Sequence, residues 1–143
     1  MIVVDTTVLV HAVGAEHELR EPSRRLVAAV EHGALEATTT PEAIQEFAHV
    51  SSRRRPRQDT VRLAHRYADL LSPLLVVEED DLRAGLRLFE RHASLGSFDA
   101  VLAAVALARK ADALVSADAA FAAVARLRHV APGTAEFERL LVP

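Results

Sequence analysis

Short apolar runs of three to five residues alternate along this chain with longer segments whose apolar residues recur every three or four positions. Runs of the first kind are typical of buried strands, and the longer spacing is typical of helices that bury one face. Strands that alternate with helices form a parallel sheet covered on both faces, because each crossover lays a helix against the sheet. The sequence therefore predicts a doubly wound α/β fold of three layers, with a short parallel sheet of four or five strands flanked by helices.

The expected elements follow from these patterns. The expected strands cover Met1–Val4, Leu35–Thr39, Leu74–Val77, Ala113–Ser116 and His129–Ala131. The expected helices cover Ser23–His32, Pro41–Ser51, Thr60–Leu71, Asp80–His92 and Ser97–Lys110. Two of the helix starts have a residue that favours an N-cap: Thr40 before Pro41, and Ser97 after Gly96.

The composition is that of one folded domain over residues 1–143. Half of the residues are apolar, which excludes a disordered chain, and there is no cysteine, which excludes disulfides, thiolate metal sites and cysteine nucleophiles. The start, Met1-Ile2-Val3-Val4-Asp5, resembles neither a signal peptide nor a membrane span. No later apolar run has the roughly 20 residues that a spanning helix needs. We expect a cytoplasmic protein without a membrane segment.

Four acidic residues stand where a sheet of this kind would bring them to one edge. Asp5 follows the first expected strand, and Asp118 follows the strand expected over residues 113–116. Ligand sites of open α/β sheets lie at the carboxyl ends of the strands, so these two carboxylates face each other if the strands are neighbours. Asp99, in the first turn of its helix, can point to the same rim. Glu46, in the middle of its helix, can reach across the mouth.

Each acid taken alone also has a purely structural explanation. Asp99 is favoured in a first helical turn by the helix dipole, and Asp118 suits the N-cap of a helix over Ala119–Ala125. Asp5 suits a turn after a strand, and Glu46 suits an exposed helix surface. The joint placement of all four at one edge favours a shared site.

The residues around these acids resemble the motifs of the PIN-domain nucleases. Asp5-Thr6-Thr7-Val8-Leu9 is similar to the family's opening, an acid followed by two small hydroxylated residues and aliphatic ones. Glu46 follows a Thr-Pro turn, as the family's helix glutamate does, and Phe98–Ala106 resembles its third acidic motif. Ser116-Ala117-Asp118-Ala119-Ala120-Phe121 matches its closing Thr/Ser-x-Asp-x-x-Phe pattern. The resemblance covers nearly the whole chain, and its size and start resemble the VapC toxins of bacterial toxin–antitoxin pairs in particular.

The resemblance implies a PIN-like fold and a metal-dependent endoribonuclease. Its catalytic residues, which would also be ligands of Mg²⁺ or Mn²⁺, are Asp5, Glu46, Asp99 and Asp118. Oxygen ligands without His or Cys favour these ions over zinc, and a metal held there would orient the phosphate and neutralise developing charge. Thr7 and Ser116 are expected to hydrogen-bond the ligand carboxylates. The partners implied are an RNA substrate, a cognate antitoxin protein and a second copy of the chain in a homodimer.

Two positions leave alternatives open. Many relatives have a further acid just before the closing phenylalanine, where this chain has Ala120, so Asp118 is the sole acid of its motif and a second metal position would be weak. Glu42 lies one turn before Glu46 on the same helix and is a rival ligand. We prefer Glu46, because the helix dipole explains an acid in the first turn.

The net charge of −3 means that a nucleic-acid site must gather its basic residues on one surface. The strongest basic run is Arg53-Arg54-Arg55-Pro56-Arg57, which we call the arginine arm. It is either a solvated connection or an arm that contacts RNA phosphates beside the active-site mouth. Tyr67 and the five phenylalanines are too few, and too helically spaced, to predict a base-stacking platform.

Other functions fit less well. A response-regulator receiver needs paired acids after the first strand and a lysine after the last, but Thr6 and Thr7 follow Asp5, and Lys110 falls in a helix. A dehalogenase-like phosphatase needs an aspartate at the position of Thr7. The remaining alternatives are a PIN fold that binds RNA with little turnover, and an RNA-processing PIN nuclease without a toxin role.

Overall fold

The fold is built on a small parallel sheet. The computed structural model describes residues 1–142. In the described part of the chain the sheet has four strands in the order β2-β1-β3-β4, all parallel. Their bounds are Ile2–Val4 (β1), Ala37–Thr38 (β2), Leu114–Val115 (β3) and His129–Val130 (β4). Strands β1 and β3 are therefore neighbours, which is the condition under which Asp5 and Asp118 were expected to face each other.

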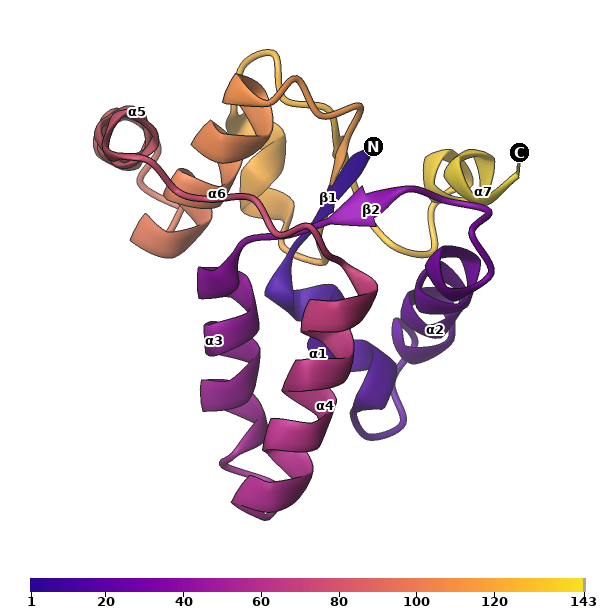
Figure 1. Ribbon diagram of the computed structural model, residues 1–143. Coiled ribbons are helices and arrows are strands. Elements are labelled where there is room, and N and C mark those ends of the chain that lie inside the picture. The colour runs from indigo at the N-terminus through magenta and orange to yellow at the C-terminus, as the bar shows by residue number, and fades with distance from the viewer. Residues whose placement is uncertain (143) are drawn as a thin grey trace.

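Helices surround this sheet on both sides (Figure 1). Their bounds are Thr6–Val13 (α1), Arg20–Glu31 (α2), Pro41–Ser51 (α3), Arg57–Leu70 (α4), Glu79–Arg91 (α5), Ser97–Ala108 (α6) and Ala135–Leu141 (α7), with a 3₁₀ helix η1 at Ala119–Ala123. Helices α3 and α4 run side by side as a hairpin that projects from the sheet, α5 packs on α6, and α2 packs on both α1 and α7.

The two faces of the sheet bury two separate apolar cores. Along β1, Ile2 and Val4 pack into the core shared with α1 and the α3–α4 hairpin, whereas Val3 packs into the core shared with α6 and η1. Successive strand residues point to opposite faces, so a run of three apolar residues is what a strand covered on both sides needs. The prediction of a three-layer α/β fold is confirmed.

Several local predictions are also confirmed. Helix α3 has the expected bounds, and the Thr40 hydroxyl accepts a hydrogen bond from the Ala43 backbone N–H at 3.2 Å as its N-cap. The other four expected helices are present, and none of their ends is shifted by more than three residues.

Two predictions about local structure are wrong, and two helices were missed. The segment Leu74–Val77 is not a strand, although its sequence is typical of one: its one described backbone bond to the sheet runs from Leu75 N–H to Thr39 C=O at 2.9 Å, so no ladder forms. Gly96 rather than Ser97 is the N-cap of α6, and no side chain caps it. Helices α1 and α7 were not expected.

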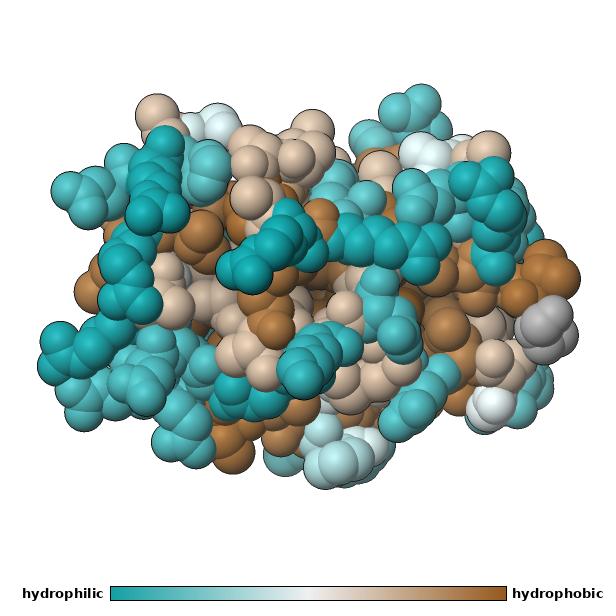
Figure 2. All heavy atoms as spheres, turned by 90° about the horizontal axis from the view of Figure 1, so that it is seen from above, coloured by the Kyte–Doolittle hydropathy of each residue, from teal (hydrophilic) through white to brown (hydrophobic). Residues whose placement is uncertain are grey.

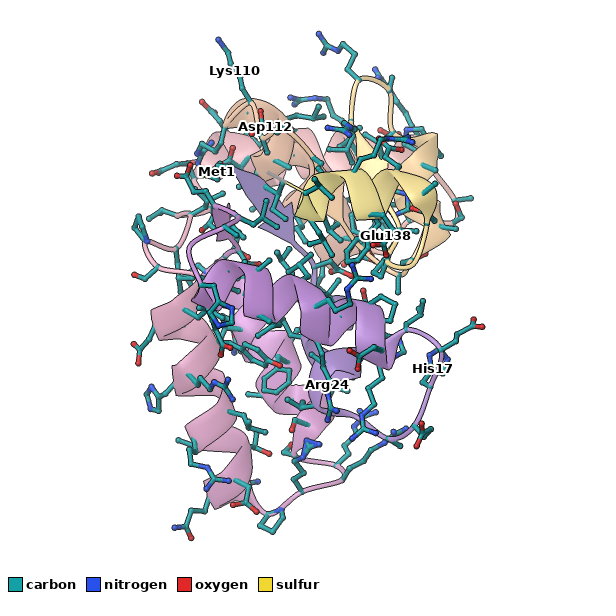
Figure 3. All side chains as sticks on the ribbon, turned by 90° about the vertical axis from the view of Figure 1, so that its right-hand side faces the viewer. Met1, His17, Arg24, Lys110, Asp112 and Glu138 are labelled. Atoms are coloured by element: carbon teal, nitrogen blue, oxygen red, sulfur yellow. The ribbon has the colours of Figure 1, made fainter. Side chains whose placement is uncertain are left out.

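The start of β1 is tied to the loop before β3. The amino group of Met1 pairs with the Asp112 carboxylate, and the Asp112 N–H donates to the Met1 carbonyl at 3.0 Å. Figure 3 shows the two residues together at one end of the molecule. This pairing fixes the register of the strand that leads into Asp5.

Candidate active site

Asp5 lies at the carboxyl end of the central strand, where the chain turns from β1 into α1. It is the N-cap of α1, so its placement follows from local chain chemistry as well as from the sheet. The residue is only 2% exposed, and every described hydrogen bond of its carboxylate uses Oδ2. The other oxygen, Oδ1, takes part in none of these bonds.

Two hydroxyl groups hold the Asp5 carboxylate. Thr7 Oγ1 and Ser116 Oγ each donate to Asp5 Oδ2 at 2.7 Å, and the two hydroxyl oxygens are 3.3 Å apart. Thr7 comes from the first turn of α1 and Ser116 from the end of β3, so the carboxylate is fixed from both neighbouring elements. Thr7 and Ser116 thus contact the Asp5 carboxylate, whose role as a metal ligand stays a prediction.

The same hydroxyls position the loop that holds Asp118. Ala117 N–H donates to Thr7 Oγ1 at 3.0 Å, and Asp118 N–H donates to Ser116 Oγ at 2.9 Å. Asp118 is the N-cap of η1 and accepts the Ala120 N–H at 2.9 Å through Oδ1. Asp118 therefore has the N-cap role considered for it, at the start of the 3₁₀ helix η1.

Glu46 is anchored by Thr6, a residue that sequence reasoning did not single out. Thr6 Oγ1 lies 3.1 Å from Glu46 Oε2 and 3.0 Å from the Ala43 carbonyl oxygen, and the threonine is buried. Burial raises the pKa of Glu46, with a further rise from the Asp5 charge and an opposing effect from the Thr6 hydrogen bond. The only signal for Thr6 in the sequence is the hydroxylated pair after Asp5.

Asp99 is electrostatically coupled to the other three acids. Burial is the largest cause that raises its pKa to about 7, followed by the charges of Asp5, Glu46 and Asp118 and a hydrogen bond with Asp118. Like charges disfavour ionisation of a neighbouring carboxyl, so the charges of the other three acids favour the protonated form of Asp99. Asp5, Glu46 and Asp99 line one cavity, and Asp118 follows the strand beside β1 at the same end of the sheet; their role as metal ligands stays a prediction.

A cavity of about 490 Å³ opens between α3, α5 and α6 beside these acids. Three of the four predicted residues, Asp5, Glu46 and Asp99, line it, whereas Asp118 is not part of its wall in the described chain. The rival acid Glu42 lines the same cavity, but the Thr6 hydrogen bond goes to Glu46. The cavity wall also includes Glu78 and Glu79.

An ion pair braces the wall that α5 and α6 contribute to the cavity. Arg109, at the end of α6, donates to both oxygens of the buried Asp81 at 2.9 and 2.7 Å and to the Val76 carbonyl at 2.8 Å. The Arg109 hydrogen bonds hold the pKa of Asp81 below its usual range. Nearby, Gly85 of α5 packs against Val101 of α6 so closely that an added Cβ would lie 2.6 Å from Val101 Cγ2.

The donors of this site fit a hard divalent cation in kind. They are all carboxylate oxygens, which Mg²⁺ and Mn²⁺ prefer. Within residues 1–142, however, no three His, Asp or Glu side chains already stand in positions that would hold a metal ion. The raised pKa of Asp99 means that a cation bound among these acids would relieve their repulsion.

The arginine arm lies at the far end of the α3–α4 hairpin (Figure 1), rather than at the cavity mouth. None of its arginines lines the acidic cavity in the described chain. Arg54 and Arg55 instead line a separate hollow beside α1, and Arg55 donates to the Val13 carbonyl. Arg53 contacts the His49 ring at 3.1 Å, and Arg57 is exposed. A role in RNA binding stays a prediction.

Viewed from above, hydrophilic side chains are spread over the whole face, with apolar ones visible between them (Figure 2). Among the helices within residues 1–142, none is both long and apolar enough to cross a membrane.

Comparisons with known proteins identify the family of this chain. The sequence matches the PIN domain family over residues 2–127. Ribonuclease VapC7 of Mycobacterium tuberculosis is 50% identical over 149 aligned positions, which cover 99% of this chain and 98% of that protein.

Two solved structures have a similar fold. Mycobacterium tuberculosis VapC20, described as a sarcin–ricin loop cleaving toxin, superposes with a TM-score of 0.74 at 19% identity, covering 86% of this chain and 94% of that one. A chain of VapBC2 from Rickettsia felis, bound to a DNA fragment from the promoter, superposes with a TM-score of 0.70 at 15% identity, covering 92% and 98%. The family match, the near-full-length identity and the acidic site together show that this chain belongs to the PIN-domain family, as a member of the VapC type.

Proposed function

We propose that this chain is a metal-dependent endoribonuclease and the toxin of a toxin–antitoxin pair, with Asp5, Glu46, Asp99 and Asp118 as its catalytic residues. The observation that carries the proposal is the cavity at the end of the central strand that Asp5, Glu46 and Asp99 line, in a chain that is 50% identical to a ribonuclease. RNA is the substrate, and the cytoplasm is where such a substrate would be met.

Carboxylates alone would repel a phosphodiester, so they assist cleavage only by holding cations. Mg²⁺ or Mn²⁺, when bound, would supply Lewis-acid stabilisation of the charge that develops on the phosphoryl group. Asp5, Glu46 and Asp99 would hold the cation, and Asp118 would contribute from the η1 side. The absence of a second acid at Ala120 favours one strongly held ion over two.

The chain's own contribution is orientation. Thr7 and Ser116 hold Asp5 Oδ2, which leaves Oδ1 for the cation, and Thr6 holds Glu46 Oε2. Buried hydrogen-bond partners of this kind reduce the reorganisation that metal binding and catalysis would otherwise require. Asp99, with a pKa of about 7, can keep a proton on its carboxyl until a cation displaces it.

The proposal is tested by incubating a total-RNA mixture with the protein in Mg²⁺, Mn²⁺ or EDTA. Discrete fragments that require metal are expected from the wild type and from Asp69→Asn, whose exposed carboxylate lies on α4 away from the site. Asp99→Asn should abolish them. If neither ion gives any cleavage while circular dichroism shows an intact fold, the chain is not a metal-dependent ribonuclease.

The toxin role and the partners need separate tests. Induced expression of the wild type should arrest bacterial growth, and Asp99→Asn should not. Co-expression with the protein encoded next to this chain should restore growth, which would identify the antitoxin. Light scattering of the purified chain should give the mass of a homodimer. A chain that cleaves RNA without arresting growth would be an RNA-processing nuclease.

A further inference from the structure

The acidic cavity has two unlike walls. One carries the carboxylates of β1, α3 and α6, with Glu78 and Glu79 at the start of α5, so six of the lining residues are acids and none of the described ones is basic. The other wall is apolar and comes from α5 and α6, with Leu82, Leu86, Phe98, Val101 and Leu102. A ligand that fills both parts must combine a group that binds cations with a flat, uncharged group.

Phe98 is the most exposed large hydrophobic residue on the apolar wall. Its side chain is 71% exposed, whereas the phenylalanines of the hydrophobic core, Phe47, Phe121 and Phe137, are fully buried. Leu82 and Leu86, on the facing helix α5, are 45% and 48% exposed. Exposing an aromatic ring to water costs free energy that a bound partner would recover, which suggests that the ring is kept for a ligand.

We propose that Phe98, with Leu82 and Leu86 opposite, forms a stacking site for one nucleobase of a single-stranded RNA at the cleaved bond. This inference rests on the proposed ribonuclease function and names the part of the substrate that the apolar wall receives. Phe98 and Asp99 line the same cavity, so a base stacked on the Phe98 ring would hold its attached phosphate near the carboxylates.

Charge complementarity favours a base over other occupants. The acids repel the phosphate backbone except where cations neutralise them, and a base is the uncharged, flat part of the same nucleotide. Single-stranded RNA is commonly bound by stacking its bases on aromatic side chains, and a cavity of about 490 Å³ is within the range of ligand pockets. Carboxylates on the rim would also accept hydrogen bonds from amino groups of a base, which would give a base preference.

The rival occupant is another protein chain. Leu82, Leu86 and Phe89 follow one another at helical spacing on α5, and Phe89 is 47% exposed but does not line the cavity. A protein contact would use this whole stripe, whereas a base would use only the part inside the cavity. Phe89 is therefore the matched control for Phe98.

Binding is measured with a tryptophan reporter, because the chain has no tryptophan. Phe98→Trp is combined with Asp99→Asn to prevent cleavage, and a random-sequence RNA decamer is titrated in Mn²⁺. Fluorescence should be quenched by the decamer and not by a decamer of abasic nucleotides. The fluorescence of Phe89→Trp in the same background should be quenched by neither RNA. Equal quenching by both RNAs, or no quenching at Phe98→Trp, would overturn the stacking site.

Cleavage gives a second readout. On an oligonucleotide that contains a cut site found in total RNA, Phe98→Ala should lower kcat/KM by roughly tenfold, Phe98→Tyr should retain most of it, and Phe89→Ala should match the wild type. With an abasic nucleotide at the cut site, wild type and Phe98→Ala should be equally slow, because the stacking partner is gone.

The outcomes separate the two proposals. If the wild type cleaves no RNA, the proposed function fails, although the fluorescence assay still decides whether a base binds. If the wild type cleaves and Phe98→Ala retains its rate and base preference, the stacking site fails alone. If Phe98→Ala and Phe89→Ala both change the oligomeric mass, and the wild type cleaves the abasic substrate as fast as the intact one, the apolar wall is a protein interface.

Discussion

Thr6 Oγ1 lies 3.1 Å from Glu46 Oε2, and this single hydroxyl connects the first turn of α1 to the middle of α3. The threonine is buried and also contacts the Ala43 carbonyl at 3.0 Å. The contact selects one rotamer of a long acidic side chain on the far wall of the cavity. Glu46 therefore depends on a residue that carries no charge and does not line the cavity.

We predict that Thr6→Val lowers RNA cleavage by about tenfold, because Glu46 loses its fixed orientation. The lost buried hydrogen bond should reduce the free energy of unfolding by about 1 kcal/mol. Thr60→Val is the matched control, since Thr60 is equally buried and bonds only to Ser51, away from the site, at 3.4 Å. A Thr6→Val protein with wild-type cleavage would show that Glu46 needs no such support.

Ser116→Ala should weaken metal binding by roughly 10- to 100-fold. The Ser116 hydroxyl donates to Asp5 Oδ2 and accepts the Asp118 N–H, so the change disturbs two of the four acids at once. Titration calorimetry with Mn²⁺ would measure the effect. Ser116→Thr retains a hydroxyl and should recover part of the affinity; equal affinities for wild type and alanine variant would contradict the assigned role.

The metal-free protein should lose stability as pH rises from about 5 to 8. The pKa of Asp99 is raised from 3.8 to about 7, and a raised carboxyl pKa means that the folded state binds the proton more tightly than the unfolded state. The contribution of Asp99 to the free energy of unfolding is therefore full below pH about 4 and is lost as pH rises through 7. Glu46, whose pKa is also raised, acts in the same direction.

Thermal unfolding with EDTA and with Mn²⁺ across this pH range tests the prediction. Mn²⁺ should raise Tm by several degrees at pH 8 and by little at pH 5, because the ion binds the ionised carboxylates. Asp99→Asn should flatten the metal-free profile and lessen the gain. A metal-free wild type whose Tm is constant from pH 5 to 8 would argue against the coupled acids.

Gly85→Ala should destabilise the protein by roughly 1–3 kcal/mol, because the added Cβ would meet the backbone of Val101 and force α5 away from α6. Gly96→Ala is the matched glycine: its Cβ would meet only Asp99 Oδ2, at 3.7 Å, and its backbone is in an extended conformation. Urea unfolding would distinguish them. Equal midpoints would show that the α5–α6 contact adjusts freely.

The arginine arm is predicted to strengthen RNA binding through phosphate contacts. Replacing Arg53, Arg54 and Arg57 by alanine should weaken binding at low salt and reduce its salt dependence by up to about one unit of slope for each lost contact. Arg91→Ala with Arg139→Ala, two exposed arginines elsewhere, is the control. Arg55 is left in place because its guanidinium holds the Val13 carbonyl. An unchanged salt slope would make the arm a solvated loop.

The positions of the four acids in the fold were more predictable than some of the elements around them. Asp5 and Asp118 follow strands whose adjacency can be inferred from general α/β topology, and Asp99 and Glu46 are placed by helix periodicity. Thr6 could not be identified from spacing, because its partner lies 40 residues away in the sequence. The same holds for the cavity wall on α5, which depends on how two helices pack.

The missed helix α1 has a specific cause. Its sequence, Thr6 to Val13, is rich in β-branched residues that favour strands, and only its tertiary contacts with α2 and α3 make it helical. Leu74–Val77 shows the opposite error: its apolar run suits a strand, but Leu74 packs in one core and Leu75 in the other, while Val76 is 62% exposed. The packing of two adjacent residues into opposite cores did not by itself produce a strand there.

The hydrogen bond between Ser116 and Asp5 joins residues that are 111 positions apart. During synthesis the amino-terminal part of a chain emerges first, and β1 then has neither its neighbour β3 nor the hydroxyl that fixes its aspartate. The centre is therefore assembled only when most of the polypeptide has left the ribosome. A chain that ends before Ser116 would carry Asp5 without one of the two hydroxyl groups that hold its carboxylate.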